Sequence, residues 1–190
     1  MIFENYLLSN INLQQQEILF ISSRAQTVTL RRNDLILQAG DICRHKIFVA
    51  SGLLRTYSID ANGNEHILQF SPEHTWTLDV ESYDKAIPSV VNIGAVEPSE
   101  ILIWEKNDFE NIRAELPSFR KFAEELISRN IYYNRQRMLT TLSATPEEKY
   151  QDFIIRFPNL LQRLPLRMIA SYLGISLKTL TRIRHAQLQR

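Results

Sequence analysis

Residues 166–184 read LRMIASYLGISLKTLTRIR, and they carry the strongest structural pattern in the chain. The apolar residues of the first half recur at i, i+3, i+4 and i+7, at Leu166, Ile169, Ala170 and Leu173. This spacing predicts a helix with one buried face. Gly174 can adopt the positive φ that ends such a helix, and Ser176 is a favoured N-cap for a second helix. The segment therefore predicts two short crossed helices.

The second of these helices is free of acidic residues and carries Lys178, Arg182 and Arg184. A basic second helix after a glycine corner is typical of a DNA-binding helix-turn-helix, whose second helix enters the major groove. Lys178 and Arg182 are candidate base contacts because both donate to guanine acceptors. The other candidate DNA-contacting residues are Arg167, Ser171, Ser176, Leu177, Thr179, Thr181, Arg184 and His185. An ordinary helical hairpin, which shows the same buried pattern, is the alternative.

Charge is unevenly distributed along the chain. Residues 1–107 hold eight Lys/Arg and thirteen Asp/Glu, a net charge of −5, whereas residues 144–190 hold eight and three, a net charge of +5. The last acidic residue is Asp152. A basic end on an acidic body indicates contact with a polyanion, although a solvated basic surface gives the same balance.

A helix without internal Gly or Pro is predicted from Pro117 to about Ser143. Its apolar residues indicate either packing on the chain's own β-domain or pairing with a second copy, and the second interpretation is favoured because a helix-turn-helix commonly works as a dimer. The candidate dimerisation residues are Phe119, Phe122, Leu126, Ile127, Ile131 and Met138. Thr145 is the expected N-cap of a further helix over 147–157.

Residues 27–106 alternate short apolar runs with turn signals, which is typical of a β-sandwich or barrel. The loop Asp60–Asn64 lies between two such runs and predicts a β-hairpin. Residues 10–21 are expected to form one helix, with Asn12 and Gln15 as its capping pair.

Several classes of protein are not expected. The single cysteine, Cys43, permits no internal disulfide and no four-cysteine cluster within one chain. No apolar run approaches the ~20 residues that span a bilayer, and the N-terminus lacks signal-peptide features. His45, His66 and His74 lack the His-x-His spacing of metal cupins, so neither a metal nor a cofactor is expected. The sequence predicts a cytoplasmic protein that is not an enzyme.

The chain resembles the Crp/Fnr family of bacterial regulators, in which a β-region, a long helix and a helix-turn-helix follow one another in this order. The resemblance spans nearly the whole chain, and its landmarks are Gly40-Asp41, Val49–Arg55, Asp60–Glu65, Pro72-Glu73 and Ile101–Phe109. It implies a cupin-like jelly-roll effector domain, a dimerisation helix and a C-terminal DNA-binding domain.

Two departures from the family pattern concern its ligands. Cyclic-nucleotide binders of the family hold the phosphate with a Gly-Glu pair and a later Arg-Ser or Arg-Thr. Here the corresponding stretches read Trp76–Asp79 and Pro88–Asn92, so cyclic AMP is not expected to bind tightly. The recognition helix reads Leu177–Arg182, LKTLTR, where the cyclic-AMP receptor has Arg-Glu-Thr-Val-x-Arg, so a different target sequence is expected. Family geometry implies an effector pocket lined by Trp76, Leu78, Val90, Asn92, Arg129 and Tyr133.

The expected architecture is α+β. An effector domain with a jelly roll covers 1–107, a short helix and the dimerisation helix cover 108–143, and an all-α helix-turn-helix domain without a clear wing covers 144–190. The predicted function is a sequence-specific DNA-binding transcription regulator. Its expected partners are double-stranded DNA, a second copy of the chain, RNA polymerase and an unidentified small-molecule effector, with no membrane. The alternative is a jelly-roll protein that binds a small molecule or metal and whose helix-turn-helix does not bind DNA.

Overall fold

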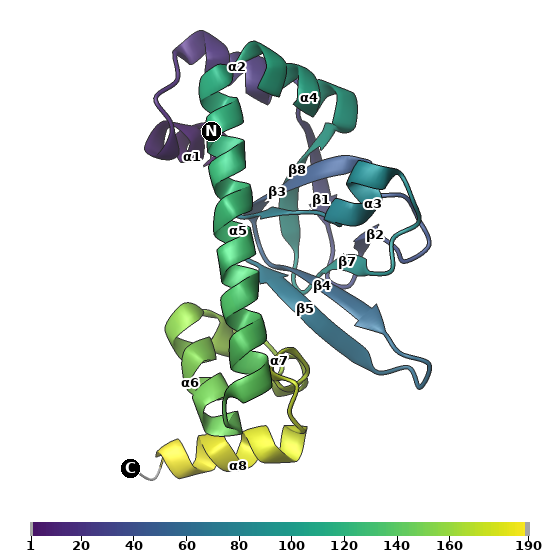
Figure 1. Ribbon diagram of the computed structural model, residues 1–190, viewed down its shortest axis with the longest axis vertical. Coiled ribbons are helices and arrows are strands. Elements are labelled where there is room, and N and C mark those ends of the chain that lie inside the picture. The colour runs from purple at the N-terminus through teal and green to yellow at the C-terminus, as the bar shows by residue number, and fades with distance from the viewer. Residues whose placement is uncertain (1, 189–190) are drawn as a thin grey trace. The chain divides into compact units, whose positions relative to one another are not determined.

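The computed structural model describes residues 2–188, which form two β-sheets, a long helix and a helical C-terminal region (Figure 1). The strands are β1 Gln26–Leu30, β2 Leu35–Leu37, β3 His45–Ser51, β4 Leu54–Ile59, β5 Glu65–Ser71, β6 Trp76–Thr77, β7 Asn92–Ala95 and β8 Ser99–Glu105. The helices are α1 Ile2–Asn10, α2 Gln15–Ser22, α3 Val80–Lys85, α4 Lys106–Glu115, α5 Pro117–Ser143, α6 Pro146–Arg156, the 3-10 turn η1 Leu160–Gln162, α7 Leu166–Leu173 and α8 Leu177–Leu188.

Two four-stranded sheets with strand orders β1-β8-β3-β6 and β2-β7-β4-β5 form a jelly roll. In the first sheet β3 pairs antiparallel with β8, which places Ile47 opposite Ile103. In the second sheet β4 pairs antiparallel with β7, which places Thr56 opposite Ile93. Because side chains alternate across a strand, Ile47, Ile103 and Ile93 share one aliphatic core to which both sheets contribute.

Aromatic side chains cover the other face of the β3–β8 sheet, where α1, α2, α4 and the start of α5 pack. Phe48 of β3 and Trp104 of β8 point to this face. The Trp104 indole N–H donates to the carbonyl oxygen of Ile21 in α2 at 2.9 Å. Phe119 and Phe122 of α5 complete the aromatic core and are almost fully buried. The first turns of α5 are thereby anchored on the roll.

The N-terminal region forms two helices rather than the single helix that the sequence predicts. A capping box opens α2, in which the Gln14 backbone N–H donates to the Glu17 carboxylate at 2.7 Å. The predicted cap at Asn12 is therefore wrong. Phe3, Tyr6 and Leu7 of α1 lie at helical spacing and pack in the aromatic core, and a helix over residues 2–10 is not among the predicted elements.

The long helix and the helix after it begin where the sequence predicts. α5 spans 27 residues from Pro117. The Thr145 hydroxyl accepts the Glu148 N–H at 3.3 Å, and the Glu148 carboxylate accepts the Thr145 N–H at 2.8 Å. This second hydrogen bond holds the pKa of Glu148 below its ordinary value. The capping box therefore fixes the start of α6.

A tight loop joins β4 to β5, as predicted. The Asp60 carboxylate accepts the backbone N–H groups of Asn62 at 2.8 Å and Asn64 at 2.9 Å. It also lies 3.0 Å from Nε2 of His66. The Asn64 side chain also donates to this carboxylate. Its hydrogen bonds, followed by the contact with His66 and those from the backbone, hold the pKa of Asp60 far below its ordinary value. One hydrogen-bond network, centred on the Asp60 carboxylate, therefore holds this exposed loop together.

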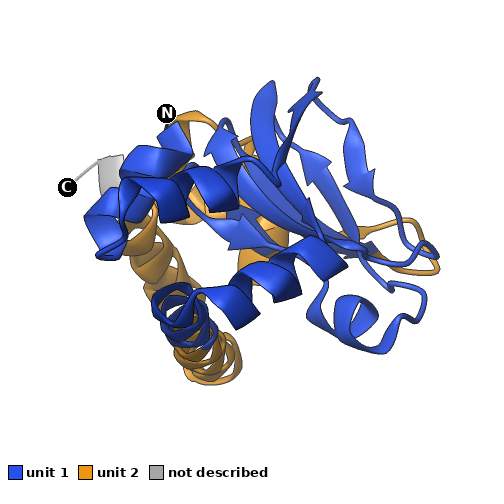
Figure 2. Cartoon of the chain, turned by 90° about the horizontal axis from the view of Figure 1, so that it is seen from above, with its two compact units in different colours: residues 1–58, 69–127 blue, residues 59–68, 128–190 orange. Residues whose placement is uncertain are grey.

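The chain divides into two compact units, which Figure 2 colours separately. The first comprises residues 1–58 and 69–127, and the second comprises residues 59–68 and 128–190. The tip of the β4–β5 hairpin thus belongs to the unit that holds α6, α7 and α8, and α5 contributes to both units. This division differs from the three consecutive segments that the sequence suggests, because the hairpin tip joins the helical unit.

The predicted fold class is confirmed: a jelly roll, a long helix and a helical C-terminal domain follow one another along the chain. Besides α1 and the 3-10 turn η1, two short elements, β6 and α3, have no counterpart among the predicted ones. They span two and six residues, which is too short for a periodic pattern to stand out from a loop.

Candidate nucleic-acid interface

Helices α7 and α8 pack against each other around a glycine corner. Gly174 adopts φ 64° and ψ 36°, the left-handed conformation that ends α7. The Ser176 hydroxyl accepts the Thr179 N–H at 3.0 Å and caps the start of α8. Ile169 of α7 and Leu180 of α8 are fully buried. The paired helices that the sequence predicts are therefore present, with the predicted caps.

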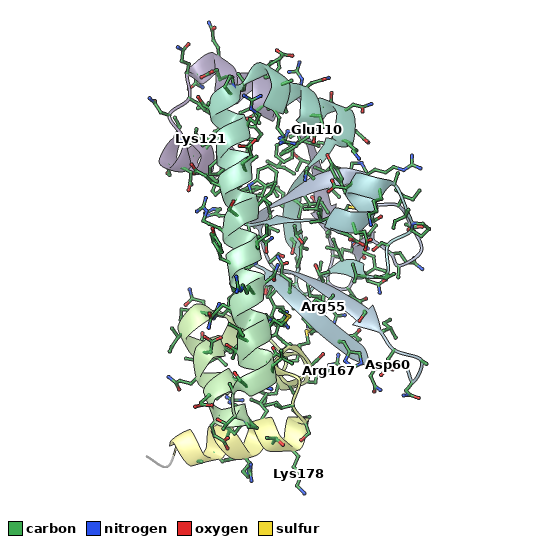
Figure 3. The ribbon with its side chains drawn as sticks, viewed as in Figure 1. Arg55, Asp60, Glu110, Lys121, Arg167 and Lys178 are labelled. Atoms are coloured by element: carbon green, nitrogen blue, oxygen red, sulfur yellow. The ribbon has the colours of Figure 1, made fainter. Side chains whose placement is uncertain are left out.

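The exposed face of α8 carries positive charge. Lys178 and Arg182 are both exposed and lie one helical turn apart. Figure 3 shows the Lys178 side chain extending from α8 into solvent. Leu177, at the start of the helix, is 48% exposed. An exposed basic face near the N-terminus of the second helix is the surface that a helix-turn-helix presents to a major groove.

An ion pair involves this face. The Arg182 guanidinium lies 3.8 Å from the Glu147 carboxylate of α6, and the two side chains are 74% and 60% exposed. Exposed pairs of this kind contribute about 0–1 kcal/mol. A DNA phosphate could therefore replace the glutamate at little cost, so the pair leaves Arg182 available.

The other predicted contacts on these helices differ in accessibility. Arg167 and His185 are exposed, and Arg184 is half-buried. The Thr181 hydroxyl donates to a backbone carbonyl of the preceding turn at 2.9 Å. The Thr179 hydroxyl lies 2.9 Å from the N-cap hydroxyl. Both threonines would have to exchange these local hydrogen bonds to contact DNA.

Ser171 is not placed as the sequence predicts. Its hydroxyl donates to the Glu65 carbonyl oxygen at 2.6 Å and accepts the Ile67 N–H at 3.0 Å. Both partners belong to the hairpin tip within the same compact unit. The hydroxyl has only one proton and uses it here. The expected phosphate contact is therefore corrected: Ser171 joins α7 to the hairpin.

A second polar cluster, which the sequence does not predict, joins α5, α6 and α7. The hydroxyl groups of Tyr133 and Tyr172 lie 2.7 Å apart. The Arg137 guanidinium lies 4.1 Å from the centre of the Tyr172 ring, and the Arg156 guanidinium lies 5.2 Å from the centre of the Tyr133 ring. Burial raises the pKa of Tyr172, and the neighbouring Tyr133 raises it further. No linear signal could have revealed pairs separated by 23 or more positions.

The predicted dimerisation residues divide into buried and exposed groups. Phe119 and Phe122 lie in the chain's own aromatic core, and Leu126 packs partly against it. Phe119 and Phe122 are not available to a partner because the sheet beneath them needs an apolar cover, so the predicted surface is corrected at these two positions, whereas Leu126 is half-buried. The exposed apolar residues of α5 include Ile127, Ile131, Met138 and Leu142, each more than half exposed.

The roll residues that are expected to line an effector pocket do not come together. Trp76 packs in the aromatic core, with its ring centre 5.2 Å from that of Phe48. Leu78 packs instead against the aliphatic core. Family geometry implied one pocket for both. β6 ends at Thr77, however, so the alternation of a strand does not extend to Leu78.

The other four expected pocket residues belong to different units, Val90 and Asn92 to the first and Arg129 and Tyr133 to the second. Val90 is 79% exposed. Asn92 is buried, but its side-chain oxygen accepts a backbone N–H at 2.9 Å from the loop after β2. Arg129 and Tyr133 belong to the second unit, where Tyr133 bonds to Tyr172. Within the roll the predicted pocket is therefore corrected, because Trp76, Leu78, Val90 and Asn92 do not line one cavity.

A carboxylate of the chain occupies the start of α3. Asp79 is the N-cap of this helix, and its Oδ1 accepts the Ser82 N–H at 3.4 Å. Its Oδ2 accepts the hydroxyl proton of Ser89 at 2.7 Å. Ser89 is buried and its oxygen in turn accepts the Val91 N–H at 3.1 Å. The Asp79 carboxylate, an anion of the chain itself, thus already accepts the Ser82 N–H and the Ser89 hydroxyl proton at this end of the roll.

A cavity of about 320 Å³ opens elsewhere in the roll, between β2 and β3. Its walls include the aliphatic side chains of Ile36, Leu37, Ile42 and Ile47, with the polar residues Asp41, Cys43, Arg44 and His45. This volume is at the lower end of small-molecule sites.

The histidines of the roll have other partners. Nε2 of His45 lies 2.9 Å from the Glu105 carboxylate, and the ring of His74 stacks on Phe48. Within residues 2–188, no three His, Cys, Asp or Glu side chains gather as a metal site would require. Over the same residues, every helix is too short or too polar to cross a membrane.

Residues 27–115 match the cyclic nucleotide-binding domain family. The transcriptional activator protein FnrA of Stutzerimonas stutzeri is 26% identical over 169 residues, which cover 81% of this chain and 67% of that protein. The regulatory protein HlyX of Actinobacillus pleuropneumoniae is 26% identical over 171 residues, which cover 81% and 68%.

Solved structures share the fold. FixK2 from Bradyrhizobium japonicum superposes with a TM-score of 0.73 at 17% identity, over 87% of this chain and 84% of that chain. The catabolite activator protein of Thermus thermophilus gives a TM-score of 0.58 at 20% identity, over 94% and 85%.

Fold, surface and relatives together define a class of protein in which a cyclic nucleotide-binding-like jelly roll is followed by a long helix and a helix-turn-helix. The relatives and the shared fold support a transcription regulator of the Crp/Fnr type. The resemblance noted from its sequence is therefore confirmed.

Proposed function

We propose that the protein is a homodimeric, sequence-specific DNA-binding transcription regulator. The observation that carries this proposal is the exposed pair Lys178 and Arg182 on α8, a helix without acidic residues whose start is fixed by the Ser176 cap. Both side chains can donate to guanine in the major groove. Arg167 and His185 are exposed and add positive or polar contacts to phosphate.

The apolar stripe of α5 supports the dimer. Ile131, Met138 and Leu142 recur on one face at steps of seven and four residues and are 59%, 58% and 78% exposed. A long amphipathic helix with an exposed apolar seam is typical of a helix pair around a two-fold axis. Two recognition helices about 34 Å apart would then meet successive major grooves. RNA polymerase is the proposed further partner of such a regulator at a promoter.

Cyclic AMP is not the proposed effector. The N-terminus of α3 and the buried Ser89 hydroxyl, two donors that could hold a phosphate, are already used by the Asp79 carboxylate. A phosphate brought to this place would meet a fixed negative charge and lose its water without new donors. A thermal-shift titration with cyclic AMP should therefore leave the melting temperature unchanged. A saturable rise of several degrees would contradict this part of the proposal.

If a small-molecule effector binds, the 320 Å³ cavity between β2 and β3 is the proposed place. Its four aliphatic residues would hold an apolar group, and the exposed Arg44 would hold an anionic one. A thermal-shift screen of small carboxylates, repeated with Arg44→Ala, tests this proposal. A carboxylate that raises the melting temperature of both proteins equally would contradict it.

The proposed DNA binding is tested by selection from random duplexes. Immobilised wild-type protein is incubated with a pool of 30-base-pair duplexes, and the retained fraction is amplified and sequenced over several rounds. We expect a motif with two related half-sites, because two copies of one recognition helix read the DNA. A pool that remains random after selection would contradict the proposal.

A further inference from the structure

Strand β5 of the β4–β5 hairpin lies at the edge of its sheet. It is the last strand of the order β2-β7-β4-β5, so one side of its backbone pairs with no other strand. Edge strands leave backbone N–H and C=O groups without ladder partners. The Glu65 C=O and the Ile67 N–H, two residues apart, point to the same side, as alternate residues of a strand do.

Ser171 of α7 takes the place of a neighbouring strand. Its hydroxyl donates to the Glu65 carbonyl oxygen at 2.6 Å and accepts the Ile67 N–H at 3.0 Å. A hydroxyl can do both at once, because it has one proton and two lone pairs. One small side chain thereby satisfies two backbone groups of the edge.

Arg137 of α5 binds the adjacent residues of the same strand. Its guanidinium donates to the carbonyl oxygen of Leu68, and to that of Ile67 at 3.3 Å. It also donates to the Tyr172 carbonyl oxygen at 3.1 Å, near the end of α7, and stacks on the Tyr172 ring. The side chain thus joins three segments: the hairpin tip, the long helix and the first helix of the helix-turn-helix.

We propose that Ser171 and Arg137 form a clasp that fastens the hairpin tip to α7, and that this clasp holds the helix-turn-helix in the orientation that binds DNA. Neither residue needs to touch DNA, so both are positioning residues. The inference rests on the proposed function, since it concerns DNA affinity. Its mechanism is preorganisation: a recognition helix already fixed loses less conformational freedom on binding.

The sign of the effect follows from the partners. The backbone groups of Glu65, Ile67 and Leu68 receive these hydrogen bonds only while α7 is docked against the hairpin. Loss of the clasp therefore loosens α7 together with the α8 that packs on it, and DNA affinity falls. An autoinhibitory clasp would behave in the opposite way, since its loss would raise the affinity.

Two substitutions with matched controls test the clasp. Ser171→Ala is compared with Ser143→Ala, because Ser143 only donates to a carbonyl of its own helix. Arg137→Ala is compared with Arg135→Ala, an exposed arginine two positions away on α5. Circular dichroism and the melting temperature of each variant establish that it is folded before binding is measured.

Backbone hydrogen exchange gives a readout that does not involve DNA. In Ser171→Ala the Ile67 amide is expected to exchange about five- to tenfold faster than in wild type, the fold-change that one lost hydrogen bond of ordinary strength produces. Arg137→Ala should speed exchange across residues 65–68 as well. The two control variants should leave this segment unchanged.

Affinity for the duplex selected by wild type gives the second readout. Ser171→Ala and Arg137→Ala are each expected to weaken binding about tenfold, with the controls within about twofold of wild type. Unchanged exchange at Ile67 in Ser171→Ala would overturn the clasp. Faster exchange with unchanged or tighter DNA binding would overturn its positioning role. A wild-type chain that binds no DNA, while exchange responds as expected, would overturn the proposed function and leave only the contact.

Discussion

Replacing Lys178 and Arg182 by alanine should abolish specific DNA binding while leaving the fold intact. Both side chains are exposed, and the pair between Arg182 and Glu147 is long and solvated. Surface substitutions of this kind change the free energy of unfolding by about 0.5 kcal/mol or less. A loss of binding in the double variant is therefore attributable to the interface and not to unfolding.

The size of the loss follows from the number of contacts. A dimer presents two copies of each residue, so the double variant removes four cationic side chains from the interface. A good base contact contributes about 1–3 kcal/mol of discrimination, so even the lower end gives about 4 kcal/mol, or about a thousandfold in the dissociation constant. If all four side chains touched phosphate instead, the slope of log K against log salt would become shallower by about 3.6.

Fluorescence anisotropy with the selected duplex, at several salt concentrations, measures both quantities. The matched control is Arg120→Ala with Lys121→Ala, two exposed basic residues at the start of α5 that change the charge by the same amount. Figure 3 labels Lys121 in this position. Affinity and salt dependence equal to wild type in the Lys178/Arg182 double variant would refute the proposed interface, because these two residues are the proposed base contacts of α8.

Three further predictions concern assembly and stability. Glutamate at both Ile131 and Met138 should convert the dimer to a monomer in analytical ultracentrifugation, because charges would enter the apolar seam of α5; a dimer that persists would exclude this seam as the interface. Thr145→Ala should lower the free energy of unfolding in urea by about 1 kcal/mol, since the hydroxyl caps α6, and an unchanged urea midpoint would argue against the cap. Burial raises the pKa of Tyr172, so its contribution to stability is complete below the unfolded pKa of about 10 and is lost as the pH rises above it. Urea midpoints should therefore fall less between pH 9 and 11 in Tyr172→Phe than in wild type, and equal falls would show that another group governs alkaline unfolding.

The parts of the structure that the sequence predicts are those governed by local rules. The bounds of α5 follow from Pro117 and the absence of internal breakers, and the caps at Thr145 and Ser176 follow from side-chain chemistry. The glycine corner at Gly174 is likewise a local requirement for positive φ. Such features need no knowledge of distant residues.

The candidate site is predicted only in part, because some side chains are used by distant segments. Ser171 has the sequence position of a phosphate contact, but its partner strand lies more than 100 positions away. Phe119 and Phe122 have the spacing of a dimer seam, yet both pack in the aromatic core of their own chain. Hydrophobic spacing shows that a face is buried and does not show against what.

Trp76 and Leu78 illustrate the limit for short strands. The family resemblance implies a common pocket for them, but the strand ends between them and they pack in different cores. The hydrogen bond between the Asp79 carboxylate and Ser89 could not be predicted from the sequence either, because Ser89 lies ten positions away on another segment.

Hydroxyl-radical footprinting of the dimer on a selected duplex tests the central claim most directly. Two recognition helices on a two-fold axis should protect two patches whose centres lie one helical turn, about 10–10.5 base pairs, apart. Protection should vanish in the Lys178/Arg182 double variant. Uniform cleavage along the duplex at saturating wild-type protein, or a single protected patch, would contradict a paired helix-turn-helix regulator.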